Sequence, residues 1–206
     1  CPIQYACLAS VGFFPESELD TLRKEGSMLQ GHPSMNRCPG IDISTGSLGQ
    51  GVSIAVGMAL GAKHLGKDTK VFALVGDGES QEGQIWEAYM AAAHYKLDNL
   101  TVIIDNNGLQ IDGKIDDVCS PYPIEDKFKA FNFHVINVDA HDFDALRKAF
   151  DEAKATKGMP TAIIAKSIKG KGVSFMENQA SWHGTAPNDE QYAQAMADLE
   201  KVGESL

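Results

Sequence analysis

Short apolar runs alternate with stretches of helical periodicity along this chain. The run Val71–Val75 is long enough for a strand and lacks polar alternation. Such a run is typical of the interior of a parallel sheet that is covered on both faces. Three further runs predict strands, at Leu100–Ile104, Phe133–Val138 and Thr161–Ala165. We therefore expect a three-layer α/β/α fold with a mostly parallel sheet.

The segments around these runs carry apolar residues at helical spacing. Gln84–Leu97 is apolar nearly all round, which indicates a largely buried helix. Asp142–Thr156 is amphipathic, and we expect its inner face to consist of Phe143, Leu146, Phe150 and Ala153. Other helices are expected at Pro2–Ala9, at Glu16–Lys24, from about Gly51 to Leu65, and at Glu190–Val202. The segments Gln30–Ser44, Leu109–Pro123 and Lys166–Gly184 are predicted to be loops.

The segment Val71–Gly113 is a β-α-β unit, whose crossover returns the second strand parallel to the first. Asp77 follows the first strand and Asn107 follows the second, so both are expected at the carboxyl edge, where open α/β proteins bind ligands. One carboxylate and one amide oxygen suit Mg²⁺, which takes its other ligands from water and substrate phosphates. In the alternative interpretation, Asp77 begins a turn and Asn107-Gly108 is only a tight loop.

Composition narrows the class of protein. The chain has 206 residues, which fits a single domain, with 43% hydrophobic and 22% charged residues. A net charge of −10 argues against nucleic-acid binding. No apolar stretch reaches the roughly 20 residues that span a bilayer, and no signal peptide is visible. Four cysteines without a CxxC motif indicate reduced thiols and a cytoplasmic location. Because the chain starts inside an apolar pattern at Cys1, we expect a truncated N-terminus.

Three other segments offer candidate chemistry. His32 lies in a Gly- and Pro-rich loop, where a lone histidine is ordinarily a surface residue. Thr45–Gly51 leads into a helix and so predicts an anion site, although it matches neither the dinucleotide fingerprint nor a P-loop. Lys166–Gly184 carries three lysines, which are either a cationic site at the sheet edge or a solvated basic tip. Gly57 and Gly61 share a helix face that suits close approach of a partner subunit or, equally, an intrachain crossing.

Several motifs in order resemble the transketolase family of thiamine-diphosphate enzymes. They are GHP at 31–33, STGSLGQG at 44–51, GDGESQEG at 76–83, WEA at 86–88, KLDNL at 96–100 and WHG at 182–184. The pattern is similar to the N-terminal, diphosphate-binding half of a transketolase, over about Pro2 to Pro187. The resemblance implies one domain over residues 1–206 with the Rossmann-like thiamine-diphosphate-binding fold.

The resemblance also implies roles for particular residues. The cofactor would be bound by Gly46, Ser47, Leu48, Gly76, Asp77, Gly78, Glu79, Asn107, Lys169 and His183. Asp77, Asn107 and the backbone carbonyl of Leu109 would hold Mg²⁺ or Ca²⁺. His32 and His183 would hydrogen-bond the substrate and exchange protons, and Glu82 matches a family glutamate at the subunit contact. For Glu82, a role as an acid at the start of a helix is an equal alternative.

The implied reaction moves a two-carbon ketol unit from a ketose phosphate to an aldose phosphate, as in the pentose phosphate pathway. The family's pyrimidine-binding half is absent from this sequence. The resemblance therefore implies that the partner is a C-terminal transketolase subunit, in an α₂β₂ assembly, and that the chain has no activity alone. Two alternatives stay open. One is half of a related enzyme, such as a deoxyxylulose-phosphate synthase or a specialised sugar-phosphate transketolase, and the other is a non-catalytic nucleotide-binding or scaffold module.

Overall fold

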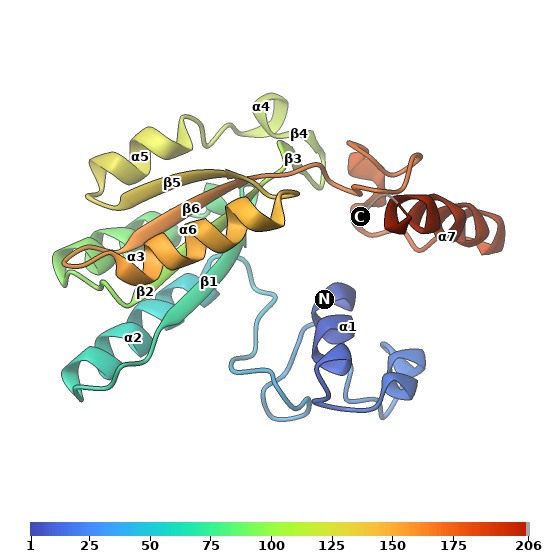
Figure 1. Ribbon diagram of the computed structural model, residues 1–206, viewed down its shortest axis with the longest axis horizontal. Helices are drawn as coiled ribbons and strands as arrows, with labels where there is room; N and C mark the ends of the chain where they lie inside the picture. Colours follow the sequence, from blue (N-terminus) through green and yellow to red (C-terminus); the bar gives the residue numbers. More distant parts are fainter. Residues whose placement is uncertain (205–206) are drawn as a thin grey trace. The chain divides into compact units, whose positions relative to one another are not determined.

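The computed structural model describes residues 1–204, whose principal element is a four-stranded parallel sheet (Figure 1). The strands of this sheet are β1 (Val71–Gly76), β2 (Leu100–Asn106), β5 (His134–Asp139) and β6 (Thr161–Lys166). The α-helices are α1 (Pro2–Ser10), α2 (Gln50–His64), α3 (Gly83–His94), α4 (Ile115–Val118), α5 (Ile124–Ala130), α6 (Phe143–Ala155) and α7 (Asp189–Gly203). A small hairpin joins β3 (Leu109–Gln110) to β4 (Gly113–Lys114). Short 3-10 helices are η1 (Glu16–Thr21), η2 (Glu79–Gln81) and η3 (Ala180–His183).

The contacts divide the chain into two compact units, Cys1–Gly51 and the part from Val52 onward. The first unit contains α1 and η1 and has its own small core, which includes Tyr5, Phe14 and Leu29. The Tyr5 hydroxyl donates to the Gln30 carbonyl at 2.7 Å and so ties α1 to the following loop. A division by contacts does not test whether residues 1–206 act as one domain, which stays a prediction.

The second unit contains the sheet and confirms the α/β fold class. The strand order is β1-β2-β6-β5, and all three pairs are parallel. Helices α2, α3 and α5 share the main core with one face of the sheet, and α6 packs on β5 and β6 with a second cluster on the other face (Figure 1). The parallel return of β2 beside β1 is as predicted, and it brings the carboxyl ends of both strands to one edge.

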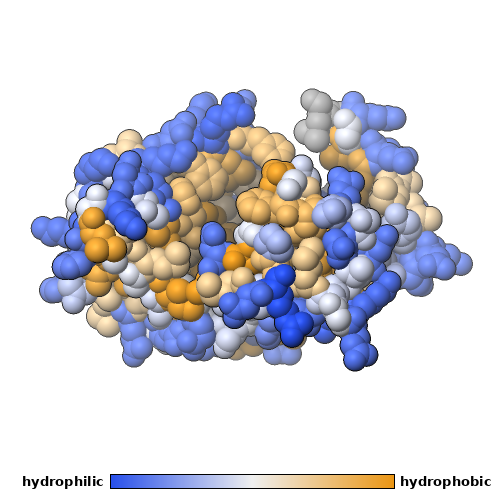
Figure 2. Space-filling model, turned by 90° about the horizontal axis from the view of Figure 1, so that it is seen from below, coloured by the Kyte–Doolittle hydropathy of each residue, from blue (hydrophilic) through white to orange (hydrophobic). Residues whose placement is uncertain are grey.

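The prediction that Val71–Val75 lies in the interior of the sheet is wrong, because β1 is an edge strand. Val71 and Val75 are buried, but Phe72 and Leu74 are 44% and 70% exposed. Phe72 meets α6 at Phe150, with 5.8 Å between ring centroids, and α6 otherwise covers β5 and β6. An apolar run therefore indicates a strand here without indicating its place in the sheet. Figure 2 shows apolar residues between hydrophilic ones on one face of the molecule.

Several local predictions also need correction. The predicted loop Leu109–Pro123 contains the β3–β4 hairpin and α4, which are too short to give a period in the sequence. Helix α5 follows it, and the hydrophobic pattern does not predict this helix. Phe143, expected on the inner face of α6, is 71% exposed, because it is the first residue of the helix. The predicted helix Glu16–Lys24 is the shorter 3-10 helix η1. Within residues 1–204, no helix is long and apolar enough to cross a membrane.

Candidate functional site

A buried carboxylate lies where β1 ends. Asp77 is fully buried, and its two oxygens accept hydrogen bonds from separate backbone donors. Oδ1 accepts from the Gly78 N–H at 2.9 Å, and Oδ2 accepts from the Gly108 N–H at 2.6 Å. Gly108 follows Asn107 directly after β2, so the structure brings together the two ends of the β-α-β unit. This part of the sequence prediction is confirmed as geometry.

The Asn107 amide is held in one orientation by its neighbours. Its Nδ2 donates to Asp105 Oδ2 at 3.1 Å, while its Oδ1 accepts from the Leu109 N–H at 3.0 Å. The other oxygen of Asp105 accepts from the Ser167 hydroxyl at the end of β6. A carboxylate that accepts from the amide nitrogen determines which end of the amide is the oxygen. Asn107 therefore presents an acceptor oxygen at the turn that carries Leu109.

A tyrosine that the sequence pattern does not single out also reaches this cluster. The Tyr122 hydroxyl lies 3.3 Å from Asp77 Oδ2 and also hydrogen-bonds Asn106 Oδ1. Asn106 is the last residue of β2. We call the set Asp77, Gly78, Asp105, Asn106, Asn107, Gly108, Leu109 and Tyr122 the strand-end site. No sequence signal marks Tyr122, since it belongs to a segment that is predicted to be a loop.

The electrostatics of the strand-end site favour a cation. Burial raises the pKa of Asp77 above its ordinary value, and the negative charge of Asp105 adds to this, against the hydrogen bonds from Gly108, Gly78 and Tyr122. None of the ion pairs within residues 1–204 includes Asp77. The fold thus buries a carboxylate beside another carboxylate, and no lysine or arginine of the described chain pairs with it.

The donor set fits a small hard cation that is completed by other oxygens. Nowhere in the described chain do three or more His, Cys, Asp or Glu side chains gather as metal ligands. The oxygens at hand are the Asp77 carboxylate, the Asn107 amide and the Leu109 carbonyl, which are too few for a calcium cage of about six to eight ligands. Mg²⁺ is bound by one or two carboxylates together with water and substrate phosphates. The residues present therefore fit Mg²⁺ with a diphosphate better than Ca²⁺ alone.

The two glycines beside Asp77 differ in how much space they leave for a side chain. A Cβ on Gly78 would lie 2.9 Å from the Gln110 Cβ, so a side chain there would push the β3–β4 hairpin away. A Cβ on Gly76 would meet only ordinary contacts, at 3.9 Å or more. The Gly76 N–H donates to Glu79 Oε2 at 3.3 Å, which closes the turn around the Asp77 backbone. Gly78 consequently sets the distance between Asp77 and the hairpin that carries Leu109.

The loop after β6 brings together two predicted cofactor residues. Lys169 Nζ lies 3.5 Å from His183 Nδ1. Partial burial lowers the pKa of His183 below its ordinary value, and the charge of Lys169 lowers it further. At neutral pH this pair therefore carries a lysine cation beside a neutral imidazole, which is able to accept or donate a hydrogen bond. The loop provides the positive charge that an otherwise acidic chain needs for an anion.

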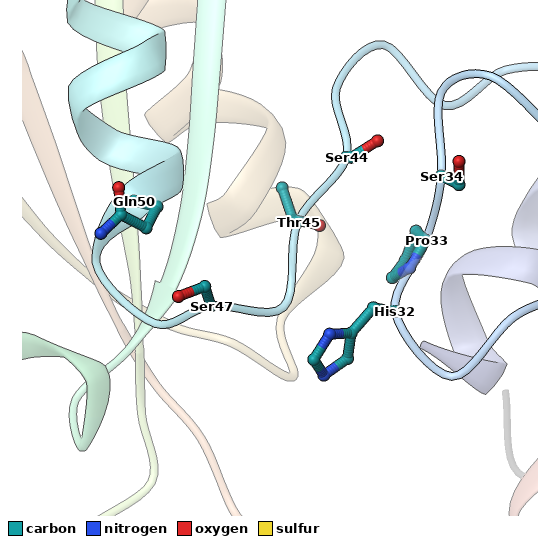
Figure 3. A pocket seen from close by; sticks show the side chains of 7 residues that line it. All are labelled: His32, Pro33, Ser34, Ser44, Thr45, Ser47 and Gln50. Carbon is teal, nitrogen blue, oxygen red and sulfur yellow. The ribbon is translucent and has the colours of Figure 1, made fainter.

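The first unit carries a separate hollow of about 350 Å³ (Figure 3). Its lining residues are His32, Pro33, Ser34, Ser44, Thr45, Ser47 and Gln50. Gly46 has a φ of +124°, and a Cβ there would lie 2.5 Å from the His32 ring. The imidazole of His32 thus packs directly on the backbone of Gly46, so these two predicted site residues lie side by side. Leu48 is exposed in the same loop.

The remaining predicted residues are less constrained. Glu82 is exposed and precedes α3 as its N-cap residue, and its side chain makes no capping hydrogen bond. Three acids, Asp112 between β3 and β4 and Asp116 and Asp117 in α4, are exposed, as expected of an acidic surface segment. No Cβ contact would arise at Gly57 or Gly61, so within the described residues the intrachain crossing considered for that helix face is absent. The functional roles of all these residues stay predictions.

Comparison with known proteins identifies the family. The model of the transketolase thiamine diphosphate binding domain matches residues 1–201. The chain is 45% identical to the 6-deoxy-6-sulfo-D-fructose transketolase subunit SqwG of Clostridium sp. (strain MSTE9), over 98% of this chain and 74% of that protein. It is 42% identical to one of the subunits of the apulose-4-phosphate transketolase of Phocaeicola vulgatus, over 98% of this chain and 72% of that protein.

The fold agrees with the same family. The crystal structure of transketolase from Campylobacter jejuni superposes with a TM-score of 0.84 at 34% identity. The matched part covers 89% of this chain but only 30% of that transketolase. The buried aspartate after β1, the amide after β2 and the glycines between them thus occur in a chain whose sequence and fold both match this domain. The chain therefore belongs to the transketolase family and contains the thiamine diphosphate binding domain of that family.

Proposed function

We propose that this chain is the N-terminal subunit of a split transketolase. With a C-terminal subunit, it would bind thiamine diphosphate and Mg²⁺ and move a two-carbon ketol unit from a ketose phosphate to an aldose phosphate. The observation that carries the proposal is the fully buried Asp77 carboxylate, which lies against Gly108 at the carboxyl ends of β1 and β2. Two similar proteins are each named as one subunit of a transketolase, and these names support the division into two chains.

In this proposal each group of residues has a separate task. Asp77, Asn107 and the Leu109 carbonyl hold the divalent ion, and Lys169 offsets the charge of the diphosphate. When bound, thiamine diphosphate supplies the electron sink for breaking the carbon–carbon bond. His183 is neutral at pH 7 because burial and Lys169 lower its pKa, so it hydrogen-bonds substrate hydroxyls as donor or acceptor. His32, on Gly46, serves the same purpose in the first unit, with Ser47 and Leu48 beside it.

The identity of the substrates is a further choice within this proposal. The two subunits reported above are named for 6-deoxy-6-sulfo-D-fructose and for apulose 4-phosphate. These names support a second candidate function, in which the transketolase is specialised for another sugar and does not act in the pentose phosphate pathway. We further propose an α₂β₂ assembly and a cytoplasmic location; the four cysteines are free in the structure, in keeping with such a location.

Co-expression with the product of the neighbouring open reading frame tests the proposal. The purified complex should bind thiamine diphosphate in a Mg²⁺-dependent manner by calorimetry and should transfer ketol units from some of a panel of ketose phosphates. ATP and NAD serve as competing ligands. Binding of a nucleotide in place of thiamine diphosphate would favour the non-catalytic module, and ketol transfer by the isolated chain would refute the need for a partner.

A further inference from the structure

One contact at the strand-end site has no counterpart among the predicted roles. The Tyr122 hydroxyl lies against both Asp77 Oδ2 and Asn106 Oδ1. Asp77 directly follows β1, and Asn106 is the last residue of β2, which pairs with β1 in parallel. A phenol has one proton, so it donates to one of the two oxygens at a time. A single hydroxyl thus connects the end of β2 with the carboxylate after β1.

Tyr122 is placed there by packing. Its ring packs against the main core, and the next two residues lead into α5, where Ile124 and Phe128 are fully buried. Phe128 in turn packs on Tyr89 of α3, with 4.7 Å between ring centroids. The packed ring and the anchored start of α5 therefore hold the hydroxyl in its position.

From this geometry we propose that Tyr122 is a positioning residue for the metal-binding carboxylate. The hydroxyl restrains rotation of the Asp77 carboxylate and, together with the Gly108 N–H, occupies Oδ2, so that the lone pair left free by Gly78 on Oδ1 is directed to the cation. Outer-shell groups of this kind orient metal ligands. The inference rests on the proposed function, since it requires Asp77 to bind the metal.

The test compares Tyr122→Phe with Tyr95→Phe in the complex of this chain with its partner subunit. Phenylalanine keeps the packed ring and removes only the hydroxyl, and Tyr95 is an exposed tyrosine after α3, so its variant is a matched control. Mg²⁺ is titrated by calorimetry at saturating thiamine diphosphate. Loss of an outer-shell partner costs roughly 10–100-fold in metal affinity, so we expect about 10-fold weaker Mg²⁺ binding for Tyr122→Phe and no change for the control.

Two further readouts separate positioning from other roles. The melting temperature of the metal-free complex should be equal for the two variants, and kcat should return to the wild-type value at saturating Mg²⁺. Unchanged Mg²⁺ affinity in Tyr122→Phe would overturn the inference. So would a kcat that stays low at saturation, or a fall in melting temperature that accounts for the affinity loss. If the wild-type complex itself binds no Mg²⁺ with thiamine diphosphate, the proposed function fails instead, which is a different result.

Discussion

The strand-end site and the hollow around His32 hold their functional groups by different means. Asp77 is fully buried and accepts hydrogen bonds from Gly78, Gly108 and Tyr122. His32 is exposed, and within the described chain its ring has no hydrogen bond; it rests on the backbone of Gly46. One group is held by several directed bonds, and the other is held by the shape of a loop.

This difference indicates which changes each region tolerates. In the strand-end site, a substitution that keeps the shape of a side chain but alters its charge should remove function, because the negative charge of the buried Asp77 carboxylate is what a cation would bind. In the hollow, a substitution that keeps charge but adds volume should do the damage, because the space over Gly46 is filled by the imidazole.

The largest effect is expected from Asp77→Asn, which keeps the volume of the side chain and removes its charge. Metal-dependent binding of thiamine diphosphate by the assembled complex should weaken by more than the roughly 10–100-fold that loss of an outer-shell partner costs. Calorimetry measures the loss, and circular dichroism checks that the fold persists. Asp117→Asn, at an exposed acid after the β3–β4 hairpin, is the matched control and should bind as wild type. Equal binding by both variants would mean that Asp77 is not a metal ligand.

A smaller effect is expected from Gly46→Ala in the hollow. The backbone there has a φ of +124°, and an added Cβ would lie 2.5 Å from the His32 ring, so both the backbone and the imidazole must shift. Backbone strain of this kind costs about 1–3 kcal/mol. Denaturant unfolding should show that loss, and the KM for the ketose donor should rise. Gly51→Ala is the control, because its Cβ would meet only Thr45 at 3.8 Å. A Gly46→Ala variant with wild-type stability and KM would contradict the packing described for His32.

A third change sharpens the comparison by adding volume to the strand-end site. Gly78→Ala places a Cβ 2.9 Å from the Gln110 Cβ at a backbone φ of −62°, which carries no strain. Overpacking costs about 1–3 kcal/mol, and we expect the lower end because the two-residue strands of the hairpin can move. Thermal unfolding of Gly78→Ala against Gly83→Ala, where a Cβ meets open space, measures it. A metal affinity reduced as severely as in Asp77→Asn would show that volume matters there as much as charge.

The meeting of Asp77 with the turn after β2 is within reach of sequence reasoning. A strand, a helix of suitable length and a second strand leave one common handedness and hence one edge for both strand ends. The strand order is not within reach, since nothing in Val71–Val75 distinguishes an edge strand from a central one. The exposure of Leu74 is decided by where α6 packs, which depends on residues much later in the chain.

The parts of the site that sequence reasoning misses depend on contacts between distant residues. Tyr122 reaches Asp77 across 45 residues, and it does so because α5 is anchored in the core by Ile124 and Phe128. The Asp105 carboxylate orients Asn107 two residues away, but its second partner, Ser167, comes from the end of β6. Local patterns predict ligands at strand ends, whereas the groups that hold those ligands come from elsewhere in the fold.

The smallest effect is expected at His183, whose partly buried ring lies beside the charge of Lys169. Its pKa lies below the ordinary 6.5 because of burial first and Lys169 second. Below pH 6.5 the unfolded chain therefore binds a proton more readily than the folded chain, and stability falls as the pH drops from 6.5 through the folded pKa. Lys169→Met removes the second cause, so the His183 pKa should rise part of the way and this acid-side loss of stability should shrink.

An NMR titration of the His183 ring measures the change directly, with Lys148→Met, an exposed lysine of α6, as the control. Burial is the larger cause and persists in Lys169→Met, so the pKa should stay below 6.5. A pKa that does not move would mean that the 3.5 Å approach of Lys169 does not persist in solution. The position of His183 would then depend on packing alone, as that of His32 does. Among the candidate site residues, pKa shifts caused by a neighbouring charge would then be found only in the strand-end site.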